Sequence, residues 1–404
     1  MLLLYARGNL LDCRRIAVDG KQCLIARRRM DFCPRRGGQP CRSQCALQCK
    51  ESRLKGTAQI GRCLDGTRDV EREGEEGTIV FFEPCVLSCR TLLACGEHGG
   101  QFDRNTAEQN AVLDGNMKGV DHVAALAVEA LLAEVAATLK PGLVDRANNG
   151  AHDDMDFFTF QASAAALAPY FAEFARAGAG HEHLDTLLAQ LRPIGCRAEA
   201  AMYARTGGVN THKGAVFSFG ILLGAAGWLM AHGGRLTADA VLDAAKTICA
   251  GLCRADYGAL AKDAVPTTKG QAAYLAYGLT GVRGEAEAGF PLVREYALPL
   301  YRTRRASHTP LNDVLVDVLL VLMAHNMDTN ILGRHDLAML HRVQGDAARI
   351  LTLGGMGTAA GRAAVEAFDA QLIAAWVSPG GSADLVAVTH FLYEMEQSDM
   401  LRSM

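Results

Sequence analysis

The chain of 404 residues has little of what marks several protein classes. Aromatic residues make up only 6% of it, and no aromatic set for base stacking accompanies its basic residues. The net charge of −3 gives the whole chain no attraction to a polyanion, so we expect no nucleic-acid partner. The composition excludes a collagen, a coiled-coil rod and a wholly disordered chain. There is ample chain to bury a core.

No secretory signal is visible, because Arg7, Arg14 and Arg15 interrupt the apolar start before an h-region can form. We therefore expect a cytoplasmic protein with reduced thiols rather than a disulfide framework. One apolar run, residues 214–231, reaches the lower length limit of a membrane span. It contains four glycines and has no second span beside it, so we interpret it as a buried core helix and expect no membrane partner.

Charge and cysteine content change near residue 110. Residues 1–110 carry a net charge of +4 and ten of the 13 cysteines, whereas residues 111–404 carry −7. The first part has little periodicity, and within it only residues 78–82 resemble a strand. We expect a Cys-rich, poorly ordered N-terminal region over residues 1–114, followed by one globular domain over residues 115–404.

Helical spacing dominates the second domain, and alternating runs of Val, Ile and Thr are nearly absent. Apolar residues recur at helical intervals from Val123 to Val135, and Pro141 with Gly142 ends that helix. The sequence thus predicts an all-α fold, a single multi-helix domain of about a dozen helices. Further helices are expected at residues 157–176, 182–191, 196–205, 214–231, 237–253, 268–277, 287–300, 310–325, 358–375 and 383–396.

Five connections between these helices are rich in the same residue types, namely Gly, Asp, Asn, His, Lys and Arg. Binding groups often sit on loops that a rigid scaffold holds, so we expect these loops to converge on a single site. The loops are residues 140–157, 206–214, 280–290, 328–330 and 378–384.

The first loop offers oxygen ligands of the kind that Mg²⁺ prefers, including Asp145 and Asp154. Helix capping is the alternative, and we favour it for Asp156. In the second loop, two glycines and Lys213 lead directly into a helix, whose free N–H groups suit a phosphate chain. No Walker A motif is present, and a capped buried helix with Lys213 reaching solvent is the alternative reading.

The third loop contains Arg283, which can fork onto a phosphate, and Glu285, which can bind metal or act as a general base. A surface ion pair between them is the alternative. Residues 328–330 either cap a helix or supply a metal ligand and a contact to a ribose. In the last loop, Gly380 and Gly381 offer backbone N–H groups to an anion, unless the loop only caps the next helix.

The N-terminal cysteines give a separate signal. Cys41, Cys45 and Cys49 are spaced four apart, and Cys85 and Cys89 could supply the second pair of a zinc site. The sequence alone therefore does not decide whether these cysteines bind zinc.

Taken in order, the loops resemble one family, the triphosphoribosyl-dephospho-CoA synthases of citrate lyase and malonate decarboxylase systems, over residues 120–395. The resemblance implies an all-helical enzyme that makes 2′-(5″-triphosphoribosyl)-3′-dephospho-CoA and adenine from ATP and 3′-dephospho-CoA. The product is the precursor of an acyl carrier protein's prosthetic group. The motifs are KPGLVDRANNGAHDDMDFFTF (140–160), LRPIGCRAEAAMYARTGGVNTHKGAVFSFG (191–220), YGLTGVRGEAEAGFP (277–291), DTNI (328–331) and SPGGSADLVAVTHFL (378–392).

Attack of a hydroxyl on C1′ of the ATP ribose builds positive charge, as in glycoside transfer. Such a centre needs carboxylates, an acid for the departing base and a clamp on the triphosphate. We assign Asp145, Asp154 and Asp328 to Mg²⁺ or the developing cation, and Glu285 to the general base. The residues expected to bind substrate or phosphate are Lys140, Arg146, Asn148, His152, Asn210, Thr211, His212, Lys213, Arg283, Asn330, Gly380, Gly381 and Ser382.

Residues 8–53 have a fainter resemblance, to the tail of holo-citrate lyase synthase, whose pattern is G-R-L-x-D-x-D-V. Here Asn9 replaces the Arg, Asp12 stands at the first Asp and Arg14 replaces the second. We interpret residues 1–110 as a truncated, diverged remnant without transferase activity.

Two other functions are weighed against the transferase. A Mg²⁺-dependent nucleoside or ADP-ribosyl hydrolase on the same scaffold predicts adenine release without dephospho-CoA. A non-catalytic nucleotide-binding module predicts ATP binding without turnover, and zinc in the cysteine-rich arm.

Overall fold

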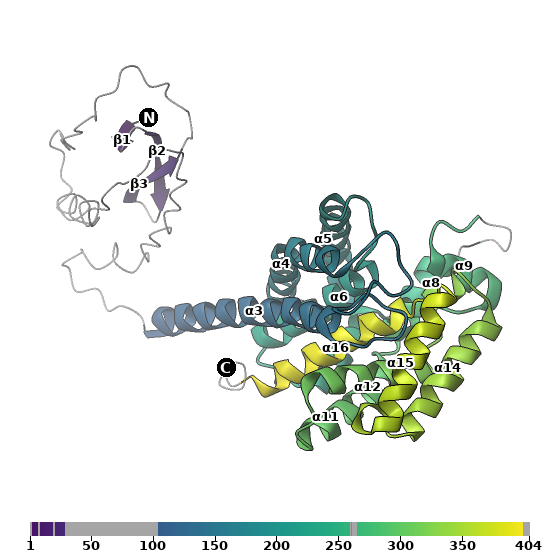
Figure 1. Ribbon diagram of the computed structural model, residues 1–404. Helices are drawn as coiled ribbons and strands as arrows, with labels where there is room; N and C mark the ends of the chain where they lie inside the picture. Colours follow the sequence, from purple (N-terminus) through teal and green to yellow (C-terminus); the bar gives the residue numbers. More distant parts are fainter. Residues whose placement is uncertain are drawn as a thin grey trace, which may run out of the picture. The chain divides into compact units, whose positions relative to one another are not determined.

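The computed structural model describes residues 2–6, 9–18, 21–28, 104–258, 260 and 265–398, with side chains from Lys118 onward. The chain divides into two compact units, Met1–Gln101 and Phe102–Met404. The boundary expected at residue 114 falls inside the first helix of the second unit, which begins at Arg104 (Figure 1).

The first unit contains a three-stranded antiparallel sheet in the order β1-β2-β3. Leu4 pairs with Leu11 across the first two strands, and Arg14 pairs with Ile25 across the next two. These strands were not predicted, although Asp19-Gly20 between β2 and β3 is a typical hairpin connection. The strands are β1 (Leu2–Ala6), β2 (Asn9–Val18) and β3 (Lys21–Arg28).

Most predictions for residues 1–114 lie outside the described residues. They include the expected strand at 78–82, the possible zinc cysteines and most of the region expected to be poorly ordered.

The second unit is helical, which confirms the all-α fold of about a dozen helices (Figure 1). A π-helical turn, η1 (Val293–Ala297), and a 3₁₀ turn, η2 (Gly355–Gly357), interrupt the α-helices. The α-helices are α3 (Arg104–Ala136), α4 (Phe157–Ala179), α5 (Leu184–Arg205), α6 (Lys213–Ala231), α7 (Ala238–Ile248), α8 (Leu252–Tyr257), α9 (Lys269–Tyr277), α10 (Gly281–Glu287), α11 (Leu298–Ala306), α12 (Leu311–His325), α13 (Thr329–Leu332), α14 (Leu337–Thr352), α15 (Ala359–Ala374) and α16 (Gly380–Gln397).

Several predicted elements differ from the observed ones. The helices expected at 182–191 and 196–205 are one helix, α5, which continues through Pro193. The loop expected at 280–290 contains α10. Helix α14 was not predicted, although its apolar residues recur at helical spacing and four of them are buried.

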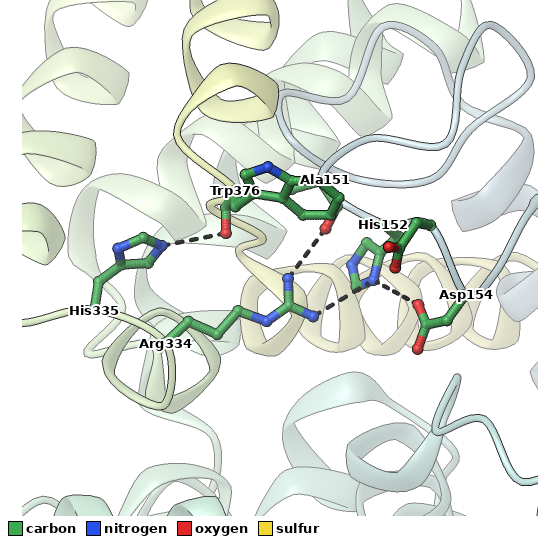
Figure 2. A pocket seen from close by; sticks show the side chains of 7 residues that line it. Ala151, His152, Asp154, Arg334, His335 and Trp376 are labelled. Carbon is green, nitrogen blue, oxygen red and sulfur yellow. Dashed lines mark hydrogen bonds and ion pairs between the residues drawn. The ribbon is translucent and has the colours of Figure 1, made fainter.

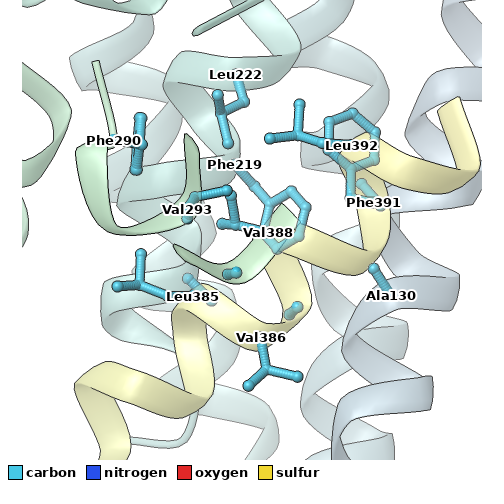
Figure 3. Packing of buried hydrophobic residues seen from close by; sticks show 14 of the residues in the cluster. Ala130, Phe219, Leu222, Phe290, Val293, Leu385, Val386, Val388, Phe391 and Leu392 are labelled. Atoms are coloured by element: carbon cyan, nitrogen blue, oxygen red, sulfur yellow. The ribbon is translucent and has the colours of Figure 1, made fainter. Parts of the chain in front are cut away.

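Helix α6 lies at the centre of the core. It packs against α3, α4, α5, α7 and α16, and Figure 3 shows Phe219 and Leu222 of α6 near Phe391 and Leu392 of α16. A Cβ on Gly227 would lie only 1.9 Å from the carbonyl oxygen of Ala175, so α4 and α6 are packed backbone to backbone. In length and composition α6 would pass as a membrane span, but most of its residues are buried inside the protein. The prediction of a buried core helix is confirmed.

The same packing brings the starts of four helices together. A Cβ on Gly214, in the first turn of α6, would meet the Asp384 carboxyl in the first turns of α16. Asp328, which caps α13, bonds to the first turn of α16. A Cβ on Gly281, at the start of α10, would lie 2.9 Å from the Thr329 side chain on α13. Four of the five predicted loops therefore meet here, the second of them through Gly214 at the start of α6.

Candidate functional site

Asp328 is a buried carboxylate at this meeting point, and four hydrogen bonds fix its position. Its side chain is 2% exposed and accepts hydrogen bonds through both oxygens. Oδ1 accepts from the backbone N–H groups of Asn330 at 2.9 Å and Gly381 at 3.3 Å. Oδ2 accepts from the N–H of Ser382 at 2.9 Å and from its hydroxyl at 3.1 Å. Burial raises the pKa of Asp328, and these bonds oppose the rise.

The predicted residues of the last loop surround this carboxylate. The Asn330 amide nitrogen lies 3.2 Å from where a Cβ on Gly380 would stand. The Ser382 hydroxyl also accepts a hydrogen bond from the Asn326 side chain, at 3.1 Å. Asn330, Gly380, Gly381 and Ser382 are thus brought together with Asp328, although about 50 residues separate the two segments.

Asp384 lies on the next turn of α16 and is partly buried. The backbone N–H of Ala215 on α6 lies near its carboxyl and acts to lower its pKa. Burial raises its pKa well above the usual value, and the nearby charges of Glu134 and Asp328 raise it further. Burial and these two charges therefore favour the protonated form of the Asp384 carboxyl. We call Glu134, Asp328 and Asp384 the carboxyl cluster.

Lys140 and His212 lie beside this cluster. Lys140 is 1% exposed and forms a buried ion pair with Glu134, whose pKa is nevertheless raised by its burial. His212 Nδ1 bonds to the Ser163 hydroxyl at 2.8 Å, and burial together with Lys140 lowers the pKa of His212 to about 3. Its Nε2 is buried and finds no hydrogen-bond partner among the described residues. A neutral imidazole with one unpaired nitrogen therefore adjoins the cluster.

A pocket of about 280 Å³ opens nearby (Figure 2). Arg334 lies across it, donating to the Ala151 carbonyl at 3.1 Å and reaching His152 Nδ1 at 3.5 Å. His152 Nε2 bonds to the Ser378 hydroxyl at 2.9 Å, and Asp154 lies 3.5 Å from its Nδ1 with an exposed carboxylate. Burial and Arg334 lower the pKa of His152.

Lys269, at the start of α9, links this pocket to the cluster. Burial and Arg334 lower its pKa, whereas Asp328 and Asp154 raise it, which places the ammonium within electrostatic reach of both carboxylates. Lys269 and Arg334 therefore give one side of the site a positive potential.

Other residues of the first loop hold its shape. Asp145 accepts from the backbone N–H groups of Lys140, Ala147 and Asn148 at 2.9, 2.6 and 3.2 Å. Asn148 donates to Asp369 at 3.0 Å and accepts from Gly150 at 2.7 Å. Both side chains therefore form hydrogen bonds with other groups of the protein.

Arg146, also in the first loop, is exposed and donates to the Asn312 side chain at 3.2 Å. Asp156 caps α4, as the sequence analysis favoured, and accepts from the N–H of Thr159 at 2.7 Å.

In the second loop, Thr211 shares the Ser163 hydroxyl with His212, whereas Asn210 and Lys213 make other contacts. Asn210 accepts from the N–H of Lys213 at 3.2 Å, and Thr211 donates to Ser163 at 2.7 Å. The Lys213 ammonium pairs with Glu199 at 3.0 Å, so it is directed toward α5 rather than toward the carboxyl cluster.

The third loop holds Arg283 and Glu285 in separate contacts, not in the surface pair considered as an alternative. Arg283 donates to Asp256 at 2.7 Å. Glu285 accepts from the backbone N–H of Leu292 at 2.8 Å, and burial raises its pKa to about 7. Its carboxylate titrates in the range that suits a general base, but it is bound to the backbone of the following helix.

Within the described part of the chain, no group of three His, Cys, Asp or Glu side chains is arranged to hold a metal ion. Of the three predicted magnesium ligands, Asp145 and Asp328 bond to protein donors through both oxygens, and Asp154 is exposed. Mg²⁺ often relies on one or two carboxylates together with substrate phosphates, and Asp154 fits that role.

Sequence reasoning missed four residues that belong to the site. Glu134 lies in the apolar helical stripe between Val123 and Val135, and Asp384 ends the last of the five loops, but neither was assigned a role in the site. Lys269 and Arg334 lie outside the five loops, and only the tertiary fold brings them to the site.

Residues 120–403 match the family model of ATP:dephospho-CoA triphosphoribosyl transferase. A 2-(5″-triphosphoribosyl)-3′-dephosphocoenzyme-A synthase of Pectobacterium atrosepticum is 47% identical over 266 residues, which cover 65% of this chain and 86% of the relative. Synthases of the same name from Escherichia fergusonii and Klebsiella pneumoniae are 44% and 43% identical over 272 and 274 residues, covering 67% of this chain and 89% and 90% of the relatives. No solved structure matches the chain. The matched region contains the whole site described above.

Proposed function

Because the chain belongs to the ATP:dephospho-CoA triphosphoribosyl transferase family, we propose that it carries out the family's reaction at the carboxyl cluster. The activity itself follows from the family: the triphosphoribosyl group of ATP is transferred to dephospho-CoA. Neither the hydrolase nor the non-catalytic module receives support from the comparisons. The observation that carries the location is the Asp384 carboxyl, whose pKa is raised by burial, near Asp328, which is held by hydrogen bonds at the starts of α13 and α16.

In this transfer the bond between C1′ of the ribose and adenine breaks, and a bond forms between C1′ and a hydroxyl oxygen of dephospho-CoA. We assign the 2′-hydroxyl as acceptor, following the family resemblance. The hydroxyl loses a proton, and the departing adenine gains one. Burial and the nearby carboxylates raise the pKa of Asp384, which favours its protonated form, so Asp384 is our choice for the acid that donates to adenine.

Asp328 supplies the negative charge that such a reaction needs. Positive charge develops at C1′ as the bond to adenine breaks, and a fixed carboxylate nearby stabilises it. Four hydrogen bonds hold Asp328 in place before substrate binds, so little reorganisation is required. Glu285 remains our proposal for the base, because its pKa of about 7 suits proton removal at neutral pH.

Lys269 and Arg334 would hold the triphosphate. Their charges line the side of the site next to Asp328, and an Arg fork matches phosphate geometry. Mg²⁺ bound by Asp154 and phosphate oxygens would neutralise charge on the triphosphate.

We further propose that the product serves the acyl carrier protein of citrate lyase or malonate decarboxylase, in the cytoplasm. The support is the resemblance of residues 8–53 to holo-citrate lyase synthase. That region is proposed to lack its own transferase activity. Transfer of a prosthetic group to a carrier protein by the purified chain would overturn this last point.

The test of the function is mass spectrometry of the full chain incubated with ATP, Mg²⁺ and 3′-dephospho-CoA. A triphosphoribosyl mass gain on dephospho-CoA with stoichiometric adenine supports the transferase. Adenine without that gain would indicate water as acceptor, and therefore the hydrolase.

A further inference from the structure

Trp376 is a large aromatic residue with an exposed ring at the pocket of Figure 2. It lies between α15 and α16, and its side chain is 52% exposed. The pocket also contains His152, Arg334 and the exposed Asp154. Other strongly exposed apolar side chains, such as Phe158 at 70%, are not among the residues that line this pocket.

The backbone holds Trp376 in an unfavourable conformation. Its φ is +56°, in the left-handed region that bulky residues rarely adopt and that Gly or Asn enters with less strain. Its N–H donates to the Ile373 carbonyl at 3.0 Å, and its carbonyl accepts from His335 at 3.2 Å. Trp376 makes both bonds through its own backbone atoms, so any residue other than Pro could make them. Core packing does not require the indole either, because half of it is exposed.

Two cations lie on the same side of the site as this ring. Arg334 crosses the pocket next to Trp376, and Lys269 lies within electrostatic reach of Arg334. A flat aromatic face beside cations suits a nucleotide, because the ring stacks on the base while the cations hold its phosphates. The volume of about 280 Å³ lies near the lower end for ligand pockets, which suits part of a nucleotide.

We propose that Trp376 is the platform on which the adenine ring of a substrate nucleotide stacks, next to the phosphate-binding Arg334 and Lys269. The proposal rests on the proposed function, since both substrates, ATP and 3′-dephospho-CoA, carry an adenine. The ring can belong to either one, and the two experiments below separate them.

The first experiment uses Trp376 as its own reporter. The chain contains two tryptophans, Trp228 and Trp376, so the Trp228→Phe variant leaves a single fluorophore in the pocket. ATP and 3′-dephospho-CoA are added separately, and inorganic tripolyphosphate serves as a probe without a base. We expect at least one adenine nucleotide to quench the fluorescence and tripolyphosphate not to. The matched Trp376→Phe variant, which keeps only Trp228, should show no quenching.

The second experiment measures steady-state kinetics. Trp376→Ala should raise KM for the nucleotide whose ring stacks by about 5- to 150-fold, and Trp376→Phe should retain most of the affinity. Trp376→Asn tests folding, because Asn tolerates the positive φ: we expect its melting temperature to equal or exceed that of the wild type, with KM raised as in the Ala variant.

The affected substrate identifies the source of the adenine. Unchanged KM for both substrates in Trp376→Ala, or equal quenching by tripolyphosphate, would overturn the platform. Quenching by an adenine nucleotide in a chain that makes no triphosphoribosyl product would support the platform and contradict the proposed function.

Discussion

Replacing Gly214 with Ala puts a methyl group where the Asp384 carboxyl now lies. An ideal Cβ at this position would be 2.0 Å from Asp384 Oδ2 and 3.1 Å from its Cγ. Real Cβ atoms essentially never approach another heavy atom within 3.0 Å. The carboxyl oxygen must therefore move by about 1 Å, or the start of α6 must move away from α16.

Two opposing effects set the size of the stability change. Ala in place of Gly inside a helix stabilises by up to about 1 kcal/mol. Overpacking costs about 1–3 kcal/mol, so the net loss should be about 0–3 kcal/mol. Catalysis is more sensitive, because a 1 Å displacement of a positioned group can cost about 100-fold in rate. We expect kcat/KM to fall by about that factor in a protein that remains folded.

The assay is adenine release at varied ATP and dephospho-CoA, with urea unfolding of the same samples. Gly345→Ala is the matched control, because Gly345 also lies within a helix, α14, and a Cβ there has no heavy atom within 4 Å. It should gain up to about 1 kcal/mol and keep wild-type kinetics. Wild-type kcat/KM in Gly214→Ala would refute the role given to the Asp384 position.

Three further outcomes are expected. His212 has a folded pKa of about 3 against an ordinary value of 6.5, so the folded state binds fewer protons and stability falls as pH falls through that range. The free energy of unfolding should change by at most about 1.4 kcal/mol per pH unit because of His212. In urea unfolding of His212→Gln, the free energy of unfolding should depend less on pH than in the wild type. Glu285→Gln should lower kcat/KM about 10²- to 10⁴-fold and remove the ionisation near pH 7 from its profile; a loss of stability alone would mean that Glu285 only caps the Leu292 N–H. Arg334→Ala should raise KM for ATP about 10- to 100-fold in initial-rate assays, and an unchanged KM would remove Arg334 from the phosphate site.

The core could be predicted because its signal is local. The run at 214–231 is apolar on every side, and a helix of that kind can only be buried or span a membrane. Helix α14 was missed although its apolar spacing is regular. Glycines made residues 280–290 look like a loop, yet residues 281–287 form α10, which packs against α7, α8 and α9.

The site could be predicted only in part. The expectation that loops converge was right for Asp328, Asn330 and the start of α16, which now share hydrogen bonds. The role of each predicted side chain depends on which hydrogen-bond donors its oxygen atoms already accept from. Tertiary contacts decide this, and the sequence does not show them. Asp145 carries the same carboxylate as Asp328, but its oxygens serve the backbone of its own loop. Lys213 pairs with Glu199, a partner that no spacing rule connects to it.

The most direct test of the account compares the wild type with Asp384→Asn under identical conditions. Adenine and the triphosphoribosyl product on dephospho-CoA are both quantified by mass spectrometry, and melting temperatures are recorded. The amide keeps the shape of the side chain but cannot give up a proton, so we expect normal folding and a rate at least about 100-fold lower. Product formation by Asp384→Asn at the wild-type rate would contradict the placement of the reaction at the carboxyl cluster.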